Sequence, residues 1–348
     1  MPYVHRSYGS QWVEPMPRVP DFLINNVVYL YRDRLEADTG AEIGGSGFLL
    51  GMNSATGTGS HCYVVTCRHV VLAGSTVVRL NLKHGSSGYE KTSCLEFTQE
   101  DWVCHPEHDL AICPLPHDAD ILEYSQGFLG YEHILTKEQC VAQYIGPGDD
   151  LLYIGRFMNH AGRYQNMPSV RFGNISMNPS EEEPIEWDDT DTGVHRKQVA
   201  YLVEARSRSG YSGSPVFFIN EHNKSNPRLL NVMFELRLLG IDFAHIPELV
   251  TLRDPRGYLN GSRWQVEIHA GMMGVIPSWY LLDFLHTSPR LIEQRRRDDE
   301  HYAAWQCTGE LDTRIIEPPK VPITPGQTVN VIDRDGKTFI TIPGPLKS

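Results

Sequence analysis

The sequence predicts an all-β fold of the sandwich or barrel class. Short runs rich in β-branched and aromatic residues recur between clusters of Gly, Pro, Asn and Asp, and stretches with the 3.6-residue helical period are few. Hydrophobic residues make up 41% of the 348 positions and charged residues 21%, which is ordinary for a globular protein and excludes a disordered chain. At roughly 150 residues per domain, this length corresponds to about two domains.

Ten runs carry the strand pattern. In chain order they are Asn26–Tyr31, Gly47–Gly51, Tyr63–Thr66, Val77–Leu82, Leu110–Pro114, Leu151–Ile154, Val199–Ala205, Pro215–Ile219, Leu238–Phe243 and Gly274–Ile276. Many short strands at this loose spacing favour a sandwich or a barrel. Ser278–Arg297 differs, because it begins with helical spacing and is interrupted by Pro289. We expect a helix there that closes the main domain.

Two polar regions are expected to lie outside the core. Pro179–Gly193 is acidic and has no hydrophobic period, so we expect a solvated surface loop. Residues 291–348 form a C-terminal extension to which the sequence assigns no task. In it a proline-rich linker follows Glu317, and the alternating run after the linker predicts a β-hairpin around Asp335–Gly336. We expect the extension to be too short for a complete PDZ domain.

The charge balance disfavours nucleic acid and membrane surfaces as partners. Lys and Arg number 31 against 43 Asp and Glu, a formal net charge of -12, which repels phosphate backbones and anionic lipids. No run reaches the roughly 18 apolar residues of a membrane span, and the N-terminus lacks the apolar core of a secretion signal. The seven cysteines are an odd number without CxxC pairs, which indicates reduced thiols. We therefore expect a cytoplasmic protein.

One segment has the composition of a zinc site. Cys104, His105, His108 and Cys113 offer four possible ligands within one short run. Neighbouring residues of a strand point to opposite faces, so Cys104 and His105 would diverge. The sequence also contains no P-loop, no dinucleotide-binding fingerprint and no H-E-x-x-H motif. We therefore expect neither a metal nor a cofactor.

Four short motifs carry the side chains of interest. TCRHVV places His69 at the end of an apolar strand, HDLAI places Asp109 before another, and GYSGSP places Ser212 in a glycine-rich turn. GSGF, at Gly45–Phe48, begins a further apolar run. Each motif alone has an ordinary structural explanation. Their significance lies in the chain order His69, Asp109, Ser212.

This set of residues fits nucleophilic acyl transfer. A serine hydroxyl needs a neutral imidazole to take its proton, and the imidazole needs a carboxylate that fixes its tautomer. The oxyanion that forms needs N–H donors held in place. The backbone of Gly210 and Ser212 can supply these donors, because a glycine allows the tight turn that points both amides inward.

The motifs resemble those of the trypsin-like (chymotrypsin-fold) serine peptidases, in particular bacterial members related to the high-temperature-requirement proteases. Thr66–His69 is similar to the family's T-A-A-H with both middle residues changed, and Asp109–Ile112 is similar to D-[LI]-A-[LV]. Gly210–Pro215 is similar to G-[DN]-S-G-[GS]-P, and Gly45–Phe48 to G-[ST]-G-F. The resemblance covers roughly residues 20 to 290.

The resemblance implies two six-stranded antiparallel β-barrels, a C-terminal helix and a short accessory tail. Residues 20–130 would form the N-terminal barrel with His69 and Asp109, and residues 131–290 the C-terminal barrel with Ser212 and the oxyanion hole. Ser207, Ser209 and Ser214 are rival nucleophiles, but only Ser212 has a glycine two residues before it and another directly after. The α/β-hydrolases and subtilisins have other orders of the three residues.

One position departs from the family pattern. Many members carry an aspartate before the nucleophile, and a newly cut N-terminus pairs with it to shape the site. Here that residue is Tyr211, which cannot form this ion pair. We therefore expect the site either to be formed from the outset or to be organised by a partner protein or by substrate.

The resemblance also suggests substrate-binding residues. Arg206 would lie at the base of the pocket for the residue preceding the scissile bond, where a cation favours an acidic side chain. Alternatively, Arg206 turns outward or pairs with Glu204. Phe243, Ala244 and His245 should lie along the substrate and bind it by β-augmentation, with His245 either touching the pocket or lying on the surface.

The sequence thus predicts a serine endopeptidase that acts on protein or peptide substrates. The alternative is a catalytically silent peptidase fold that serves as a binding module. Because His69 must be neutral to act as a base, the rate of an active enzyme should rise between about pH 6 and 7.5, where ordinary histidines titrate.

Overall fold

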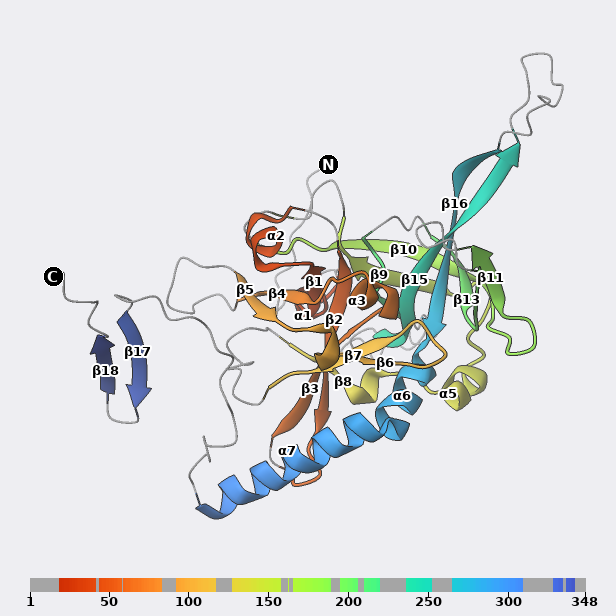
Figure 1. Ribbon diagram of the computed structural model, residues 1–348. Helices are drawn as coiled ribbons and strands as arrows, with labels where there is room; N and C mark the ends of the chain where they lie inside the picture. The colour runs from red at the N-terminus through yellow and green to blue at the C-terminus, as the bar shows by residue number, and fades with distance from the viewer. Residues whose placement is uncertain are drawn as a thin grey trace, which may run out of the picture. The chain divides into compact units, whose positions relative to one another are not determined.

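The computed structural model describes residues 19–41, 44–57, 59–82, 92–116, 127–157, 162, 165–188, 195–205, 210–219, 236–251, 265–308, 328–333 and 336–341. In these residues the chain is mostly β, with one closed antiparallel barrel and a few helices (Figure 1). The chain divides into two compact units, residues 1–299 and 300–348.

All ten runs predicted as strands form strands. They are β1 Val27–Tyr31, β2 Gly45–Asn53, β3 Ser60–Thr66, β4 Val77–Asn81, β7 Ala111–Pro114, β9 Asp150–Gly155, β13 Tyr201–Glu204, β14 Pro215–Ile219, β15 Leu236–Thr251 and β16 Gln265–Pro277. The largest differences from the prediction are in β15 and β16, which extend well beyond the predicted ends as a long two-stranded ribbon (Figure 1).

The sequence does not predict six further strands of the first unit. These are β5 Thr92–Glu96, β6 Val103–Cys104, β8 Leu129–Gly130, β10 Ser169–Met177, β11 Ile185–Asp188 and β12 His195–Gln198. The residues of β10 do not alternate between buried and exposed, because Ile175 is its one buried residue. Pairing with β9 and β13 holds it in the barrel.

The acidic segment Pro179–Gly193 is only partly the surface loop that the sequence predicts. Ile185–Asp188 of this segment form β11, which pairs with β12 in an antiparallel two-stranded sheet. The prediction is therefore wrong for these residues. Glu186 of β11 forms an ion pair with Lys197 of β12, and such cross-strand charge pairs stabilise a ribbon that has little apolar surface to bury.

The N-terminal half forms an eight-stranded sheet whose strands do not close into a ring in the described residues. Its order is β5-β4-β1-β2-β3-β7-β6, and β8 pairs in parallel with β2. Every residue of β1 is buried, which explains its continuous apolar run VVYLY. Within the described ranges no pairing joins β5 to β6, so the first of the two predicted six-stranded barrels is not shown.

The C-terminal half forms the predicted six-stranded barrel. Its strands close in the order β10-β13-β16-β15-β14-β9, and all their pairings are antiparallel. Alternate residues of β9 join two different buried clusters. Leu151 and Tyr153 lie with residues of the barrel strands, whereas Leu152 and Ile154 lie with the core of the N-terminal sheet. Because strand side chains alternate between faces, one strand contributes to both cores.

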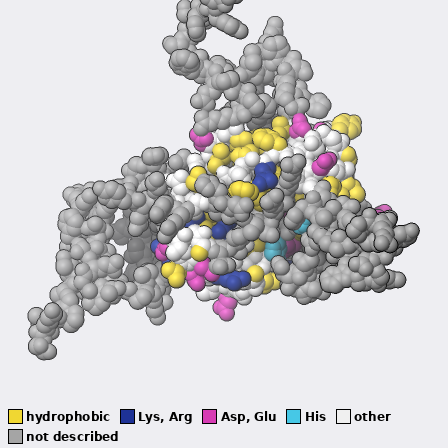
Figure 2. All heavy atoms as spheres, turned by 90° about the horizontal axis from the view of Figure 1, so that it is seen from above, with side chains coloured by type: hydrophobic (Ala, Val, Ile, Leu, Met, Phe, Trp, Pro, Cys, Tyr) yellow, Lys and Arg dark blue, Asp and Glu magenta, His cyan; other side chains and the backbone are white. Residues whose placement is uncertain are grey.

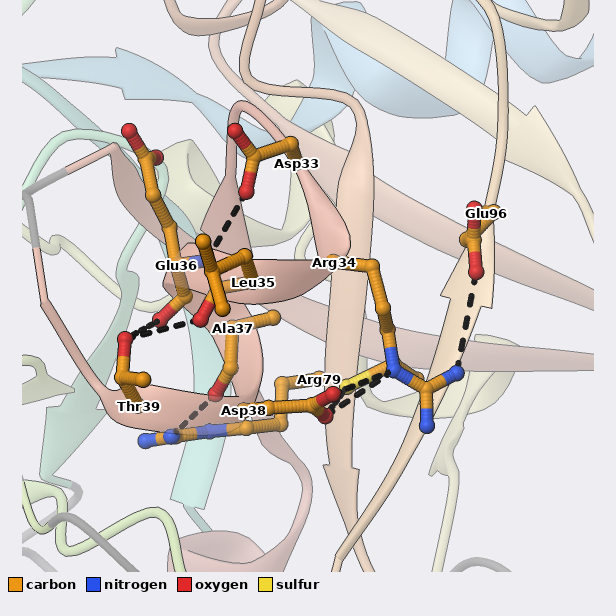
Figure 3. Close-up of polar contacts among 10 residues, drawn as sticks. Asp33, Arg34, Leu35, Glu36, Ala37, Asp38, Thr39, Arg79 and Glu96 are labelled. Atoms are coloured by element: carbon orange, nitrogen blue, oxygen red, sulfur yellow. Dashed lines mark hydrogen bonds and ion pairs between the residues drawn. The ribbon is translucent and has the colours of Figure 1, made fainter.

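Short helices precede the first strand or occupy the connections between strands. They are α1 Asp21–Asn25, α2 Arg34–Thr39, α3 Arg68–Leu72, α5 Lys137–Ala142 and the 3-10 turns η1 Gln99–Asp101 and η2 Tyr131–His133. α2 shows how they are fixed (Figure 3). The Asp33 side chain caps its N-terminus by accepting from Glu36 N at 2.8 Å, and the buried Arg79 of β4 donates to Ala37 O at 2.7 Å.

Two helices follow the barrel, as the interruption at Pro289 predicts. α6 Ser278–Thr287 begins directly after β16, and its Ser278 hydroxyl donates to Leu135 O at 2.8 Å. α7 Pro289–Thr308 starts at the proline, which lacks an N–H and is therefore favoured at the first helical position. The predicted start of the C-terminal extension at residue 291 falls inside α7.

The second unit contains the predicted β-hairpin. β17 Thr328–Asp333 and β18 Gly336–Thr341 pair antiparallel, with Asp333 opposite Gly336. Among the described residues, no helix has the length and apolar character that crossing a membrane requires. On the face drawn in Figure 2, described Lys and Arg side chains lie scattered among apolar and acidic ones.

Candidate active site

His69 and Asp109 are brought together by the pairing of β3 with β7. β3 ends at Thr66, opposite Ala111 at the start of β7, so the residues flanking these two positions lie side by side. Asp109 Oδ2 lies 2.6 Å from His69 Nδ1, and Asp109 Oδ1 accepts from the His69 backbone N at 2.8 Å. The carboxylate thus holds both the ring and the main chain of His69.

Burial differs between the side chains of Asp109 and His69. The Asp109 side chain is 6% exposed, whereas that of His69 is 33% exposed. Burial alone would raise the pKa of Asp109, but the charge and hydrogen bonds of the adjacent His69 hold it below its usual range. Asp109 is therefore a carboxylate at neutral pH, and the His69 ring retains an accessible edge.

A third residue holds Asp109 from the other side. Gln198, at the end of β12, accepts from Asp109 N at 3.1 Å through Oε1, and its Nε2 lies 2.9 Å from His108 Nδ1. Burial lowers the pKa of His108, so its ring is neutral and can accept this hydrogen bond at Nδ1. Sequence reasoning misses Gln198, because no motif surrounds it and it lies far along the chain from Asp109.

Ser212 lies on a tight turn between β13 and β14. Gly210 and Gly213 both have φ near 90°, a conformation that favours glycine. Gly213 N donates to Asp242 O at 2.7 Å, and Ser214 N donates to Tyr211 O at 2.8 Å. A Cβ on Gly213 would lie 2.0 Å from Ser46 O, so the approach of this turn to β2 also requires a glycine there.

The GSGF segment, Gly45–Phe48, lies between this turn and α3, the helix that carries His69. Ser46 N donates to Ser212 O at 2.9 Å, and Ser46 Oγ donates to Gly210 O at 2.8 Å. A Cβ on Gly45 would lie 2.8 Å from Val70 and 3.1 Å from Ser212 O. Val70 follows His69 in α3, so the Ser212 backbone lies against the same glycine as the first turn of the histidine helix.

The turn also offers main-chain donors. Within the described part of the chain, the N–H groups of Gly210 and Ser212 donate to no protein acceptor. Two amides separated by one residue can serve a single anionic oxygen where both point toward it. The sequence predicts that role for these two N–H groups.

Comparison with known proteins gives distant structural likenesses. No protein-family model and no curated protein match the chain. Solved structures do match. The active form of the Rv3671c protease from M. tuberculosis aligns over 80% of this chain and 95% of that chain, with 18% identity and a TM-score of 0.39. An inactive serine-to-alanine mutant of Rv3671c aligns over 80% of this chain and 99% of that chain, with 18% identity and a TM-score of 0.37.

The predicted substrate-binding residues are only partly described. Arg206, and the rival serines Ser207 and Ser209, lie outside the described residues. Phe243 is 2% exposed, and its ring would lie 2.5 Å from a Cβ placed on Gly274, so the ring packs against β16. Ala244 and His245 are half-buried. The pairing of β15 with β14 ends at Ile241, and beyond it the strand continues along β16.

The cysteines and histidines near the site fit thiols and hydrogen-bonded rings better than metal ligands. Cys67, His69 and Asp109 offer ligand atoms within 4.8 Å of one another. However, the fully buried Cys67 donates through Sγ to Asp242 O, and burial holds its pKa well above the usual value, whereas a metal needs a thiolate. In the CHPEH segment, His105 Nδ1 accepts from the backbone N of both Glu107 and His108.

Proposed function

We propose that this protein is a serine endopeptidase with Ser212 as nucleophile, His69 as general base and acid, and Asp109 as the orienting carboxylate. The observation that carries this proposal is the two-point contact of Asp109 with His69 beside the glycine-rich Gly210–Ser214 turn. A carboxylate that holds an imidazole through both Nδ1 and the main chain fixes which ring nitrogen carries the proton.

The reaction follows from this tautomer. With the proton on Nδ1 facing Asp109, His69 Nε2 accepts the proton of the Ser212 hydroxyl as its oxygen attacks the substrate carbonyl. The tetrahedral oxyanion takes hydrogen bonds from the N–H groups of Gly210 and Ser212. The imidazolium then protonates the leaving amine. Water, deprotonated by His69, hydrolyses the acyl-enzyme and regenerates Ser212.

The finer features of the site belong to the same proposal. The N-terminal sheet corresponds to the first barrel of the fold, and substrate lies between the sheet and the closed barrel. The main chain of Phe243–His245 binds the substrate as an added strand. Arg206 forms the base of the specificity pocket and selects an acidic side chain.

A fluorophosphonate probe tests the nucleophile, because it reacts with activated serines only. We expect labelling of the wild-type protein that disappears in Ser212→Ala. Ser214→Ala is the matched control, since Ser214 is a buried serine two residues away on the same turn, and it should retain labelling. Absence of labelling in folded wild-type protein would refute the proposal and favour the catalytically silent binding module.

A further inference from the structure

Tyr211, the residue before the proposed nucleophile, is held by side chains of a strand that is distant in sequence. Tyr211 is completely buried, and its hydroxyl accepts a hydrogen bond from Arg171 Nε at 2.7 Å. The same hydroxyl makes a second hydrogen bond with Ser169 Oγ. Both partners lie on β10, which is 40 to 42 residues from Tyr211 in sequence. β10 belongs to the same closed barrel.

The ring of Tyr211 is held as firmly as its hydroxyl. It meets the ring of Tyr153 edge to face at a centroid distance of 5.5 Å, and the Arg171 guanidinium lies 5.2 Å from its centroid. A Cβ on Gly155 would lie 2.7 Å from Tyr211 Cδ1, so β9 passes directly against the ring. The side chain therefore has one position within the barrel.

Such an anchor matters because two glycines give the turn backbone conformations that other residues rarely adopt. Gly210 and Gly213 lie on either side, and glycines cross between backbone conformations more easily than any other residue. Tyr211 lies between the two amides proposed to bind the oxyanion. Rotation of a single peptide plane there would turn one N–H away from the reacting oxygen.

We propose that Tyr211 is a positioning residue, pinned by Arg171 and Ser169, that holds the Gly210–Ser214 turn in the shape needed to bind the oxyanion. This inference rests on the proposed peptidase function. All three side chains belong to the barrel, so the turn is held without a newly cut N-terminus or a partner protein. Of the two possibilities that the sequence leaves open, the geometry therefore favours a site formed from the outset.

The test removes the anchor from each side. Tyr211→Phe deletes only the hydroxyl, and Arg171→Met replaces the donor by an apolar side chain of similar length. We expect kcat for peptide cleavage to fall by about 10- to 100-fold in each variant with KM nearly unchanged, because the lost interaction acts on the transition state. The affinity of a peptide boronic acid, which forms a tetrahedral adduct, should fall in parallel with kcat/KM. The double variant should be no worse than the poorer single one, since both act through one contact.

Tyr201→Phe is the matched control. Tyr201 is a buried tyrosine of the same barrel on β13, away from the turn, and its variant should retain wild-type kcat. Equal losses of kcat in Tyr211→Phe and Tyr201→Phe would overturn the inference, because they would indicate general loosening of the barrel. Wild-type kcat in a labelled, folded Tyr211→Phe protein would overturn it as well. Failure of the wild-type protein to react with fluorophosphonate would instead refute the proposed function.

Discussion

At the scale of single residues, the candidate site depends on the hydrogen bonds of Asp109. His69 binds both of its carboxylate oxygens, and Gln198 accepts from its backbone N–H. A buried carboxylate with this many contacts cannot rotate. His69 therefore has a defined ring orientation.

Replacing the carboxylate by an amide tests this arrangement. In Asp109→Asn the amide has nearly the same shape, but its NH₂ group favours the wrong imidazole tautomer. We expect kcat to fall by about 10⁴-fold with KM little changed. Steady-state kinetics on a cleaved peptide measure this, with the exposed Asp283→Asn as control. A loss smaller than about tenfold would contradict the orienting role.

At the scale of elements, the Gly210–Ser214 turn and the GSGF segment fit together because their glycines have no side chain. The Gly210–Ser214 turn approaches the start of β2 and the end of β3 so closely that Gly213 faces both Ser46 O and Thr66 Oγ1. The GSGF segment of β2 fills the space between that turn and α3. Three motifs that are separate in the sequence thus form one contact region.

Adding a methyl group to this contact region should disrupt it. Gly213→Ala combines positive φ with a Cβ that would lie 2.0 Å from Ser46 O and 2.4 Å from Thr66 Oγ1. We expect the free energy of unfolding to fall by at least about 2 kcal/mol, with loss of probe labelling. Urea denaturation measures this loss.

Gly74→Ala is the control for backbone strain alone. Gly74 has φ of 91°, but a Cβ there would meet nothing within 4 Å. This variant should lose only about 1 kcal/mol and should retain labelling. Equal losses in the two variants would show that the close approach of the turn to β2 contributes nothing.

At the scale of the molecule, both halves of the first unit share their core. β9 contributes alternate residues to the barrel cluster and to the N-terminal sheet cluster, so the two are built on a common strand. The helices after the barrel add to this core. The ring of Phe284 from α6 meets the ring of His105 at 4.7 Å, close to the loop that carries Asp109.

The burial of His105 makes stability depend on pH. Burial, with a smaller effect from His108, lowers the pKa of His105 to about 4, whereas an unfolded histidine titrates near 6.5. Between these values the unfolded state binds more protons than the folded state, so the free energy of unfolding rises with pH across this window and levels off above about 6.5. Urea denaturation at several pH values should show this slope.

His105→Gln should reduce this slope between pH 4 and 6.5, and His108, whose pKa burial also lowers, should keep part of it. Asp109 gives a separate signal, because its lowered pKa means that its contribution is lost only as the pH falls below the usual carboxyl range. A slope that is identical in wild-type protein and in His105→Gln would contradict the assignment to His105.

The sequence by itself determined the local features of this protein. Burial imposes a repeating pattern on the residues of a strand, and turns need glycine at fixed places, so the ten strands, the Pro289 interruption and the settings of His69, Asp109 and Ser212 can be read from short windows. The sequence does not predict β10 and β11, because half-exposed strands that are held by pairing carry no such pattern. Only the tertiary structure decided that Gln198 supports Asp109, that Arg171 and Ser169 hold Tyr211, and that β10 pairs between β9 and β13 in the barrel. These outcomes depend on hydrogen bonds between distant, common polar residues and on strand order, which no short window encodes.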